Sequence, residues 1–174
     1  KIAVGPRAVG AIDINAPITA NLEAVAKAKG EQVRDITAVI LDRDRHNDLI
    51  AEVREAGARI RLIPDGDVAG AISTAWEDSG ADVLIGIGGT PEGVITAAAL
   101  KAMGGEMQGR LWPRNEKERT ESLELGNGLE QVLSTDDLVK GGNCLFASTG
   151  SSVGELGQGG GWHRHPGSAA SLGG

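Results

Sequence analysis

Two clusters of acidic residues and glycines follow apolar segments of this sequence and could bind a phosphate together with a metal ion. Asp65, Gly66 and Asp67 come after one apolar segment, and residues 88–93 (Gly-Gly-Thr-Pro-Glu-Gly) come after the next. Each cluster is predicted to end a strand and open a helix, where free N–H groups and the helix dipole favour an anion. Because carboxylates beside an anion normally need a cation between them, we expect a divalent metal that bridges carboxylates and phosphate. The pattern predicts a metal-dependent, phosphate-handling enzyme.

Two arginines follow another predicted strand, at the same edge of the predicted sheet. Arg43 and Arg45 flank Asp44 just after the apolar segment at residues 36–41. Arginine binds phosphate through two parallel N–H···O bonds. Ligands of open α/β sheets bind beside the carboxyl ends of the strands, so three such ends favour one shared phosphate site. For the arginines alone, a solvated charged surface is the alternative.

The acidic and glycine clusters also have alternatives. Asp is a favoured helix N-cap and Asp-Gly a favoured turn, so Asp65 and Asp67 could serve the backbone alone. Haloacid dehalogenase-type phosphatases place a nucleophilic Asp after an apolar strand, in the pattern D-x-D-x-[TV]. In the segment that begins at Asp65, Ala69 stands where the pattern needs Thr or Val. In the earlier segment, which begins at Asp42, His46 stands at that position, so neither segment matches the pattern. The glycines of residues 86–93 lack the G-x-G-x-x-G spacing of dinucleotide sites, so a tight turn is their alternative.

Composition narrows the class of protein. Of 174 residues, 40% are hydrophobic and 24% charged, which is enough for one globular domain or a large part of one. A net charge of −7 without a basic stripe argues against a nucleic-acid surface. The single cysteine, Cys144, excludes an internal disulfide and a cysteine-rich zinc site, as is typical of the reducing cytosol. No apolar run approaches the roughly 18 residues that cross a bilayer. We expect a cytoplasmic protein without nucleic-acid or membrane partners.

Short apolar segments alternate with amphipathic segments along the chain, which predicts strands alternating with helices. The predicted strands are residues 1–5, 36–41, 58–63, 81–87, 106–112 and 143–148. The predicted helices are residues 15–30, 47–56, 67–79, 90–104 and 115–125. This alternation predicts an α/β fold with a layered, mostly parallel sheet and helices on both faces.

Residues 151–174 differ in composition from the rest of the chain. Eight of these 24 residues are glycine, and the apolar positions follow neither the strand nor the helix period. Such a segment cannot bury enough apolar surface to offset its ordering entropy, so we interpret it as a disordered tail. His163 and His165 could suggest a metal pair, but no further ligands surround them in the sequence.

Four segments together resemble class II fructose-1,6-bisphosphatases. They are Gly10-Ala11-Ile12-Asp13, Arg45-His46, residues 63–69 (Ile-Pro-Asp-Gly-Asp-Val-Ala) and residues 86–94 (Gly-Ile-Gly-Gly-Thr-Pro-Glu-Gly-Val). The similarity runs in order through residues 1–150 and corresponds to the carboxyl-terminal half of such an enzyme. It implies a sugar-phosphatase-type α/β fold and metal-dependent hydrolysis of the 1-phosphate of fructose 1,6-bisphosphate. In some bacteria the family also hydrolyses sedoheptulose 1,7-bisphosphate.

The resemblance also implies roles for single residues. Glu92 would be a metal ligand, and the metal would be Mg²⁺ or Mn²⁺. The residues that would contact the sugar bisphosphate are Arg43, Asp44, Arg45, Asp65, Gly66, Asp67 and Gly89. The family places the enzyme in gluconeogenesis and glycerol metabolism, and we expect a homo-oligomer when the protein is complete.

Two departures from the family pattern lead to further expectations. The catalytic residues are expected in an amino-terminal half that this sequence lacks, so we expect this half alone to be inactive. A non-catalytic fragment that at most binds a sugar phosphate is therefore the alternative to an enzyme. The family continues with an ordered segment where the glycine-rich residues 151–174 stand, so we interpret these residues as an aberrant, frame-shifted tail. A single reading frame shared by body and tail in the gene would refute that interpretation.

Overall fold

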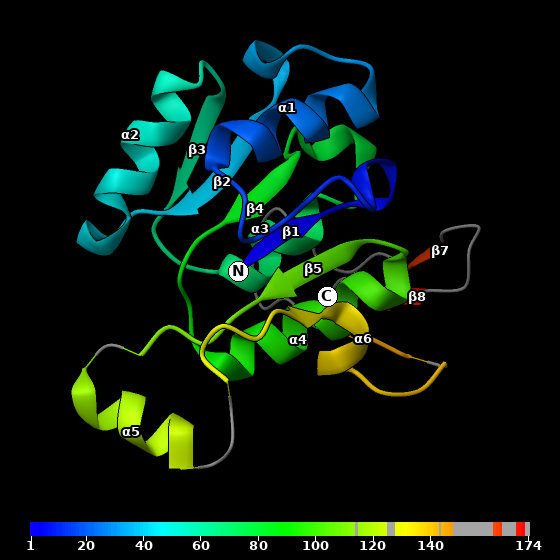
Figure 1. Cartoon of the computed structure of the whole chain (residues 1–174). Coiled ribbons are helices and arrows are strands. Elements are labelled where there is room, and N and C mark those ends of the chain that lie inside the picture. The colour runs from blue at the N-terminus through cyan, green and yellow to red at the C-terminus, as the bar shows by residue number, and fades with distance from the viewer. Residues whose placement is uncertain (114, 125–127, 143, 148–161, 165–169, 173–174) are drawn as a thin grey trace.

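Six strands form one sheet in the computed structural model, which describes residues 1–113, 115–124, 128–142, 144–147, 162–164 and 170–172. The order of the strands across the sheet is β3-β2-β4-β1-β5-β6 (Figure 1). Their bounds are β1 (Ile2–Val4), β2 (Thr37–Leu41), β3 (Arg59–Ile63), β4 (Val83–Ile85), β5 (Glu106–Gly109) and β6 (Leu133–Ser134). Strands alternate with helices along the chain, so the predicted α/β class is confirmed.

The sheet is mixed, with most strands pointing in one direction. β2 pairs in parallel with both β3 and β4, whereas β1 is antiparallel to β4 and β5, and β6 is antiparallel to β5. β2, β3, β4 and β5 therefore point the same way, and β1 and β6 are reversed. Because Ile2 pairs with Ile85, the start of β1 lies beside the carboxyl end of β4.

Helices cover both faces of the sheet, as Figure 1 shows. Their bounds are α1 (Ile18–Lys29), α2 (Asn47–Glu55), α3 (Asp67–Ser73), α4 (Thr90–Met103), α5 (Glu116–Glu124) and α6 (Thr135–Leu138). On one face, Leu22 of α1 and Val53 of α2 are fully buried against the sheet. On the other face, Ala71 of α3 and Leu100 of α4 are fully buried around Met107 of β5. The highly charged α5 stands away from the sheet.

Some predicted elements differ from those observed. The strand predicted at residues 81–87 is reduced to β4, and α3 ends at Ser73 and is followed by a 3-10 turn at Glu77–Ser79. The strand predicted at residues 143–148 is wrong: residues 144–147 have no regular structure, and residues 143 and 148 lie outside the described residues. The last strand of the six-stranded sheet is the short β6, which pairs with β5. Cys144, expected inside the strand predicted at residues 143–148, is only half-buried and its Sγ donates to the Ala98 carbonyl at 3.3 Å.

The glycine-rich tail lies mostly outside the described residues, so its predicted disorder stays a prediction. Within it, β7 (Trp162–Arg164) and β8 (Ala170–Leu172) form an antiparallel pair that its composition did not predict. His163 lies in β7, whereas His165 lies outside the described residues.

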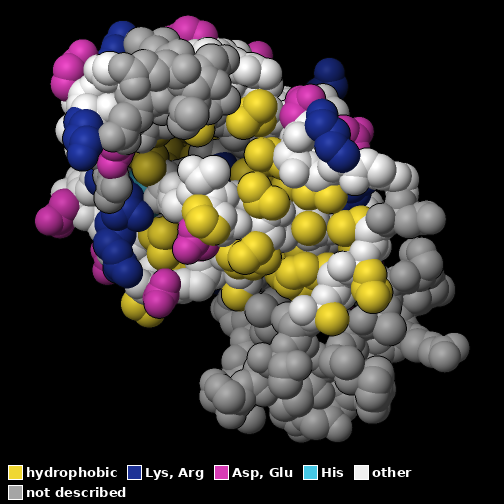
Figure 2. Space-filling model, turned by 90° about the horizontal axis from the view of Figure 1, so that it is seen from below, with side chains coloured by type: hydrophobic (Ala, Val, Ile, Leu, Met, Phe, Trp, Pro, Cys, Tyr) yellow, Lys and Arg dark blue, Asp and Glu magenta, His cyan; other side chains and the backbone are white. Residues whose placement is uncertain are grey.

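Apolar side chains are exposed on the helical layer that contains α4. Figure 2, seen from the side where α4 and α6 lie in Figure 1, shows these side chains gathered into a wide area. Val94 and Ile95 of α4 are 40% and 47% exposed, and Leu145, which follows Cys144 on this layer, is 79% exposed. None of the described helices is long and apolar enough to cross a membrane.

Candidate functional site

The carboxyl ends of three strands meet at one edge of the sheet, as predicted from the sequence. β3, β2 and β4 are parallel neighbours, so Leu41, Ile63 and Ile85 all end at this edge. The segment after β2 is tied to the end of β3 because the Asp42 N–H donates to the Ile63 carbonyl at 2.9 Å. The same segment is tied to the end of β4 through His46, which follows the two arginines. The sheet therefore places the arginines, the acidic pair and the glycine loop side by side.

His46 is the side chain that connects the ends of β2 and β4. It is 1% exposed; its Nδ1 lies 2.8 Å from the Leu41 carbonyl and its Nε2 accepts the Ile87 N–H at 2.9 Å. Because Nε2 is an acceptor, the proton must be on Nδ1 and the ring is neutral. A Cβ on Gly86 would approach Nε2 to 3.2 Å, so the glycine allows the loop to lie against the ring.

The two arginines differ in their contacts. Arg45 donates through Nε and Nη2 to the Ile87 carbonyl at 3.3 and 3.0 Å, so its guanidinium reaches from the end of β2 to the β4 loop. Arg43 donates through Nη1 to the adjacent Asp42 carbonyl at 2.8 Å. Both arginines and Asp44 between them are exposed. The alternative of a solvated charged surface therefore applies to Arg43. The side chain of Arg45, by contrast, is fixed by its hydrogen bonds to the loop after β4.

The two aspartates after β3 also differ. Asp65 is exposed and its Oδ1 accepts the Gly66 N–H at 2.8 Å. Gly66 has a positive φ of 81° and occupies the N-cap position of α3, where no side chain makes a capping hydrogen bond. Asp67 is the first residue of α3 and is only 7% exposed. The N-cap alternative is therefore wrong for both aspartates, although Asp65 does stabilise the turn.

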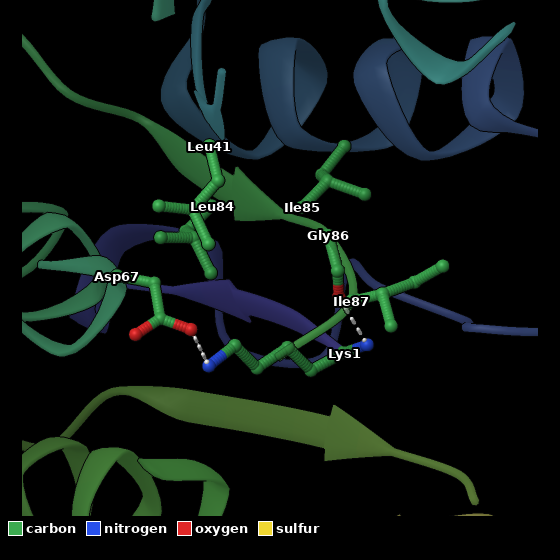
Figure 3. Close-up of a pocket in the computed structure, with 7 residues that line it drawn as sticks. All are labelled: Lys1, Leu41, Asp67, Leu84, Ile85, Gly86 and Ile87. Atoms are coloured by element: carbon green, nitrogen blue, oxygen red, sulfur yellow. Dashed lines mark hydrogen bonds and ion pairs between the residues drawn. The ribbon is translucent and has the colours of Figure 1, made fainter. Parts of the chain in front are cut away.

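Asp67 pairs with a residue that sequence reasoning missed. The Nζ of Lys1 donates to Oδ2 of Asp67 at 2.5 Å, and Figure 3 shows the two side chains meeting. The α-amino nitrogen of Lys1, by contrast, donates to the Gly86 carbonyl at 2.9 Å. The pocket around the pair is lined by Lys1, Leu41, Asp67, Leu84, Ile85, Gly86 and Ile87. The pairing depends on β1 running antiparallel to β4, which local sequence patterns do not reveal.

The loop after β4 leads into α4. Gly89 is the N-cap and Thr90 is the first helical residue. Glu92 is exposed in the first turn, and its carboxylate folds back so closely that a Cβ on Gly89 would overlap Oε2. A Cβ on Gly88 would lie 2.5 Å from Oδ2 of Asp67. The two glycines therefore let carboxylates of α3 and α4 lie against the loop.

Comparison with known proteins identifies the family. The family model described as "Bacterial fructose-1,6-bisphosphatase, glpX-encoded" matches residues 1–172. The chain belongs to this family. The match confirms the resemblance drawn from the motifs and leaves the haloacid dehalogenase alternative unsupported.

Two relatives show how much of the family protein this chain represents. It is 41% identical over 169 residues to the fructose-1,6-bisphosphatase class 2 of Haemophilus influenzae, covering 90% of this chain and 51% of the relative. It is 43% identical over 169 residues to the fructose-1,6-bisphosphatase 1 class 2 of Escherichia coli K12, covering 90% of this chain and 50% of the relative. The chain therefore spans about half the length of the curated relatives it matches.

The metal site implied for this fructose-1,6-bisphosphatase family member is not formed by the described residues alone. Among them, no group of three or more His, Cys, Asp or Glu side chains is placed to hold a metal ion. Asp67 is already paired with Lys1, and the Asp65 carboxylate is directed to the Gly66 N–H. A Mg²⁺ ion needs several oxygen ligands in near-octahedral geometry, so Glu92 by itself does not fit the role of a complete site.

The stability of this family member is expected to fall as the pH drops below about 6.5, because His46 must stay neutral. Burial lowers the pKa of His46 below its usual value of 6.5, and the nearby Arg45 charge lowers it further. The unfolded chain therefore binds a proton at higher pH than the folded chain. The stabilisation is complete above pH 6.5 and is lost as the pH falls from there towards the folded pKa. Urea unfolding between pH 8 and pH 5 measures this loss.

The matched variant is His46→Gln, which keeps an acceptor for the Ile87 N–H but does not titrate. Burial also lowers the pKa of the Lys1 α-amino group to about 6, and this group is present in both proteins. The difference between their unfolding curves therefore isolates His46. Parallel pH profiles for the two proteins would contradict a neutral, buried histidine.

Proposed function

We propose that this chain forms the sugar-bisphosphate-binding half of a class II fructose-1,6-bisphosphatase, which releases the 1-phosphate of fructose 1,6-bisphosphate. The meeting of three strand ends carries this proposal: it places Arg45, Asp67 and the Gly88–Gly89 loop at one edge. Membership of the family supports the reaction. Sedoheptulose 1,7-bisphosphate, with the same phosphate groups on a longer sugar, is a second proposed substrate.

The residues divide into three roles. Arg43 and Arg45 bind the distal phosphate, to which guanidinium groups can donate two hydrogen bonds. Asp44, Asp65 and Asp67 accept hydrogen bonds from sugar hydroxyl groups. The backbones of Gly66 and Gly89 approach the substrate closely because no Cβ intervenes. Positioning of this kind lowers the barrier by fixing the orientation of the reacting phosphate.

A divalent metal, Mg²⁺ or Mn²⁺, is part of the proposal for the complete protein only. We assign Glu92 to it as one ligand and place the remaining ligands in the half of the family protein that this chain does not span. The exposure of Glu92 in the first turn of α4 supports this assignment, because a second half could reach it. Turnover therefore requires both halves, and we place the complete enzyme, as a homo-oligomer, in cytoplasmic gluconeogenesis and glycerol metabolism.

Sugar-phosphate binding without turnover is the second candidate for this chain alone. The lack of a three-ligand metal group among the described residues favours it. Phosphate release can be tested in a hybrid enzyme, in which this chain replaces the matching half of the Escherichia coli relative. Turnover by the hybrid and none by the isolated chain would support the division of labour proposed here.

Changing Arg45 to Ala in the hybrid enzyme is expected to raise the KM for fructose 1,6-bisphosphate about 10- to 100-fold. This range corresponds to the free energy of one or two hydrogen bonds to a charged group, which the variant loses. The kcat/KM for a monophosphate ester that lacks the distal phosphate should change less. Arg43→Ala should have the smaller effect, because its guanidinium is turned to its own neighbour, Asp42. Steady-state kinetics on both substrates measures the difference.

Arg59→Ala is the matched control for these arginine variants. Arg59 is exposed at the start of β3, on the opposite edge of the sheet, and pairs only loosely with Asp35 at 3.4 Å. Its replacement should leave KM unchanged. Equal losses on both substrates in Arg45→Ala would mean that Arg45 supports the fold or the reacting phosphate, contrary to the proposal.

A further inference from the structure

The ion pair between Lys1 and Asp67 is largely removed from solvent. The two side chains are 7% and 10% exposed, and the 2.5 Å contact joins Nζ to Oδ2 (Figure 3). Leu41, Leu84, Ile85 and Ile87 line the same pocket. Charges in such apolar surroundings interact more strongly than charges in water, and each is costly to leave without its partner. The pair therefore fixes the Asp67 carboxylate in one orientation.

Only one oxygen of Asp67 is used by this pair. Oδ2 accepts from Lys1, whereas Oδ1 has no hydrogen-bond partner among the described residues. The only fully enclosed side-chain oxygen or nitrogen without a partner in the described part of the chain is Oγ1 of Thr96. Oδ1 of Asp67 is therefore still reached by solvent. A ligand hydroxyl can donate to Oδ1 while Lys1 holds Oδ2.

The glycine loop presses against the same pair. A Cβ on Gly88 would lie 2.5 Å from Oδ2 of Asp67 and 3.1 Å from Nζ of Lys1. Gly88 is followed by the N-cap glycine of α4, and Arg45 contacts the carbonyl of Ile87 just before it. Lys1 therefore lies beneath the loop at which the three strand ends meet.

We propose that Lys1 is a positioning residue for sugar-bisphosphate binding, acting through Asp67; this role rests on the function proposed above. Its ammonium group holds Oδ2 so that Oδ1 can accept a sugar hydroxyl. It also cancels the charge of Asp67, which would otherwise repel the phosphates of the ligand at short range. Asp67 can thus act as a hydrogen-bond acceptor beside an anion without a metal ion between them.

Three variants of the 174-residue chain separate positioning from mere stabilisation. Lys1→Met removes both the charge and the donor, and Lys1→Gln keeps a donor for Oδ2 but removes the charge. The matched control is Lys29→Met, because Lys29 pairs with the buried Asp82 at the opposite edge of the sheet, with 15% and 8% exposure. Unfolding in urea measures stability, and NMR titration with fructose 1,6-bisphosphate measures Kd at Gly88 and Gly89.

Positioning predicts that affinity and stability separate. We expect Lys1→Met and Lys1→Gln to raise Kd at least tenfold, although Lys1→Gln recovers part of the stability that Lys1→Met loses. Lys29→Met should lower the urea midpoint without changing Kd. If Lys1→Met does not fold, Lys1→Gln still decides the question.

Two results would overturn the role of Lys1. A Kd that is unchanged in Lys1→Gln, or that follows the urea midpoint through all three variants including Lys29→Met, would reduce the pair to a structural contact. No ligand-induced shift at Gly88 and Gly89 in the unmodified chain would instead refute the binding function itself, and the positioning role with it. NMR titration of the unmodified chain distinguishes the two failures, because only failure of the binding function abolishes its ligand-induced shifts.

Discussion

Replacing Glu92 by Gln is expected to reduce the turnover of the hybrid enzyme by about 100-fold or more. Loss of a group that only supports a metal ligand costs roughly 10- to 100-fold in metal affinity or activity, and loss of a ligand should cost at least the upper figure. Gln preserves the shape of the side chain and removes its charge. Calorimetric titration with Mn²⁺ should show weaker binding to the variant, and excess Mn²⁺ should restore only part of the turnover.

The alternative role of Glu92 is to interact with the dipole of α4, since it lies in the first turn of that helix. A dipole partner contributes roughly 0.3–1 kcal/mol to stability and nothing to turnover. Asp48, in the first turn of α2, provides the control: Asp48→Asn removes the same kind of charge and should leave turnover intact. Near-normal turnover of Glu92→Gln at ordinary Mn²⁺ concentration would eliminate the metal assignment.

The largest effect on stability is expected from Gly5→Ala. A Cβ at this position would overlap the Thr74 carbonyl oxygen and lie 2.7 Å from the Thr74 carbonyl carbon and 2.8 Å from Cα of Ala75. All three are backbone atoms, and that backbone is fixed by the hydrogen bonds from Thr74 N–H to Ala71 and from Ala75 N–H to Ile72. Since no flexible side chain can move aside, the loss should reach about 3 kcal/mol or more, the upper end of overpacking effects.

Gly142→Ala is the control for this prediction. Apart from Gly142 itself and its chain neighbours, no atom of the described residues lies within 4 Å of a Cβ built on Gly142, and its backbone is not in the left-handed region. Its stability should stay within about 0.5 kcal/mol of the unmodified chain, as for most surface substitutions. Urea unfolding followed by circular dichroism compares the two proteins. Equal urea midpoints for the two variants would show that Gly5, the residue after β1, does not lie in close contact with the backbone of Thr74 and Ala75.

The sequence by itself determined most of the elements and the family. The continuous apolar segment at residues 36–41 predicted β2 almost to the residue, because a strand covered on both faces leaves little room for polar side chains. The prediction at residues 58–63 was as close for β3, although Arg59 and Arg61 interrupt its apolar residues. Gly30 and Gly104 predicted the ends of α1 and α4, and both have the positive φ that favours glycine at this position. The motifs around Asp65 and Gly89 predicted the family, because their spacing is specific enough without a fold.

The tertiary structure alone decided which groups meet at the site. Apolar periodicity reports that a segment is buried but not beside which strand or in which direction it lies. The reversal of β1 brings Lys1 to Asp67, 66 residues away, and the placement of β4 beside β2 brings Ile87 to Arg45. For the same reason, no local pattern predicted that the short β6 pairs with β5. Strand neighbours are selected by long-range packing and hydrogen bonding across the whole sheet, so no local pattern in the sequence contains them.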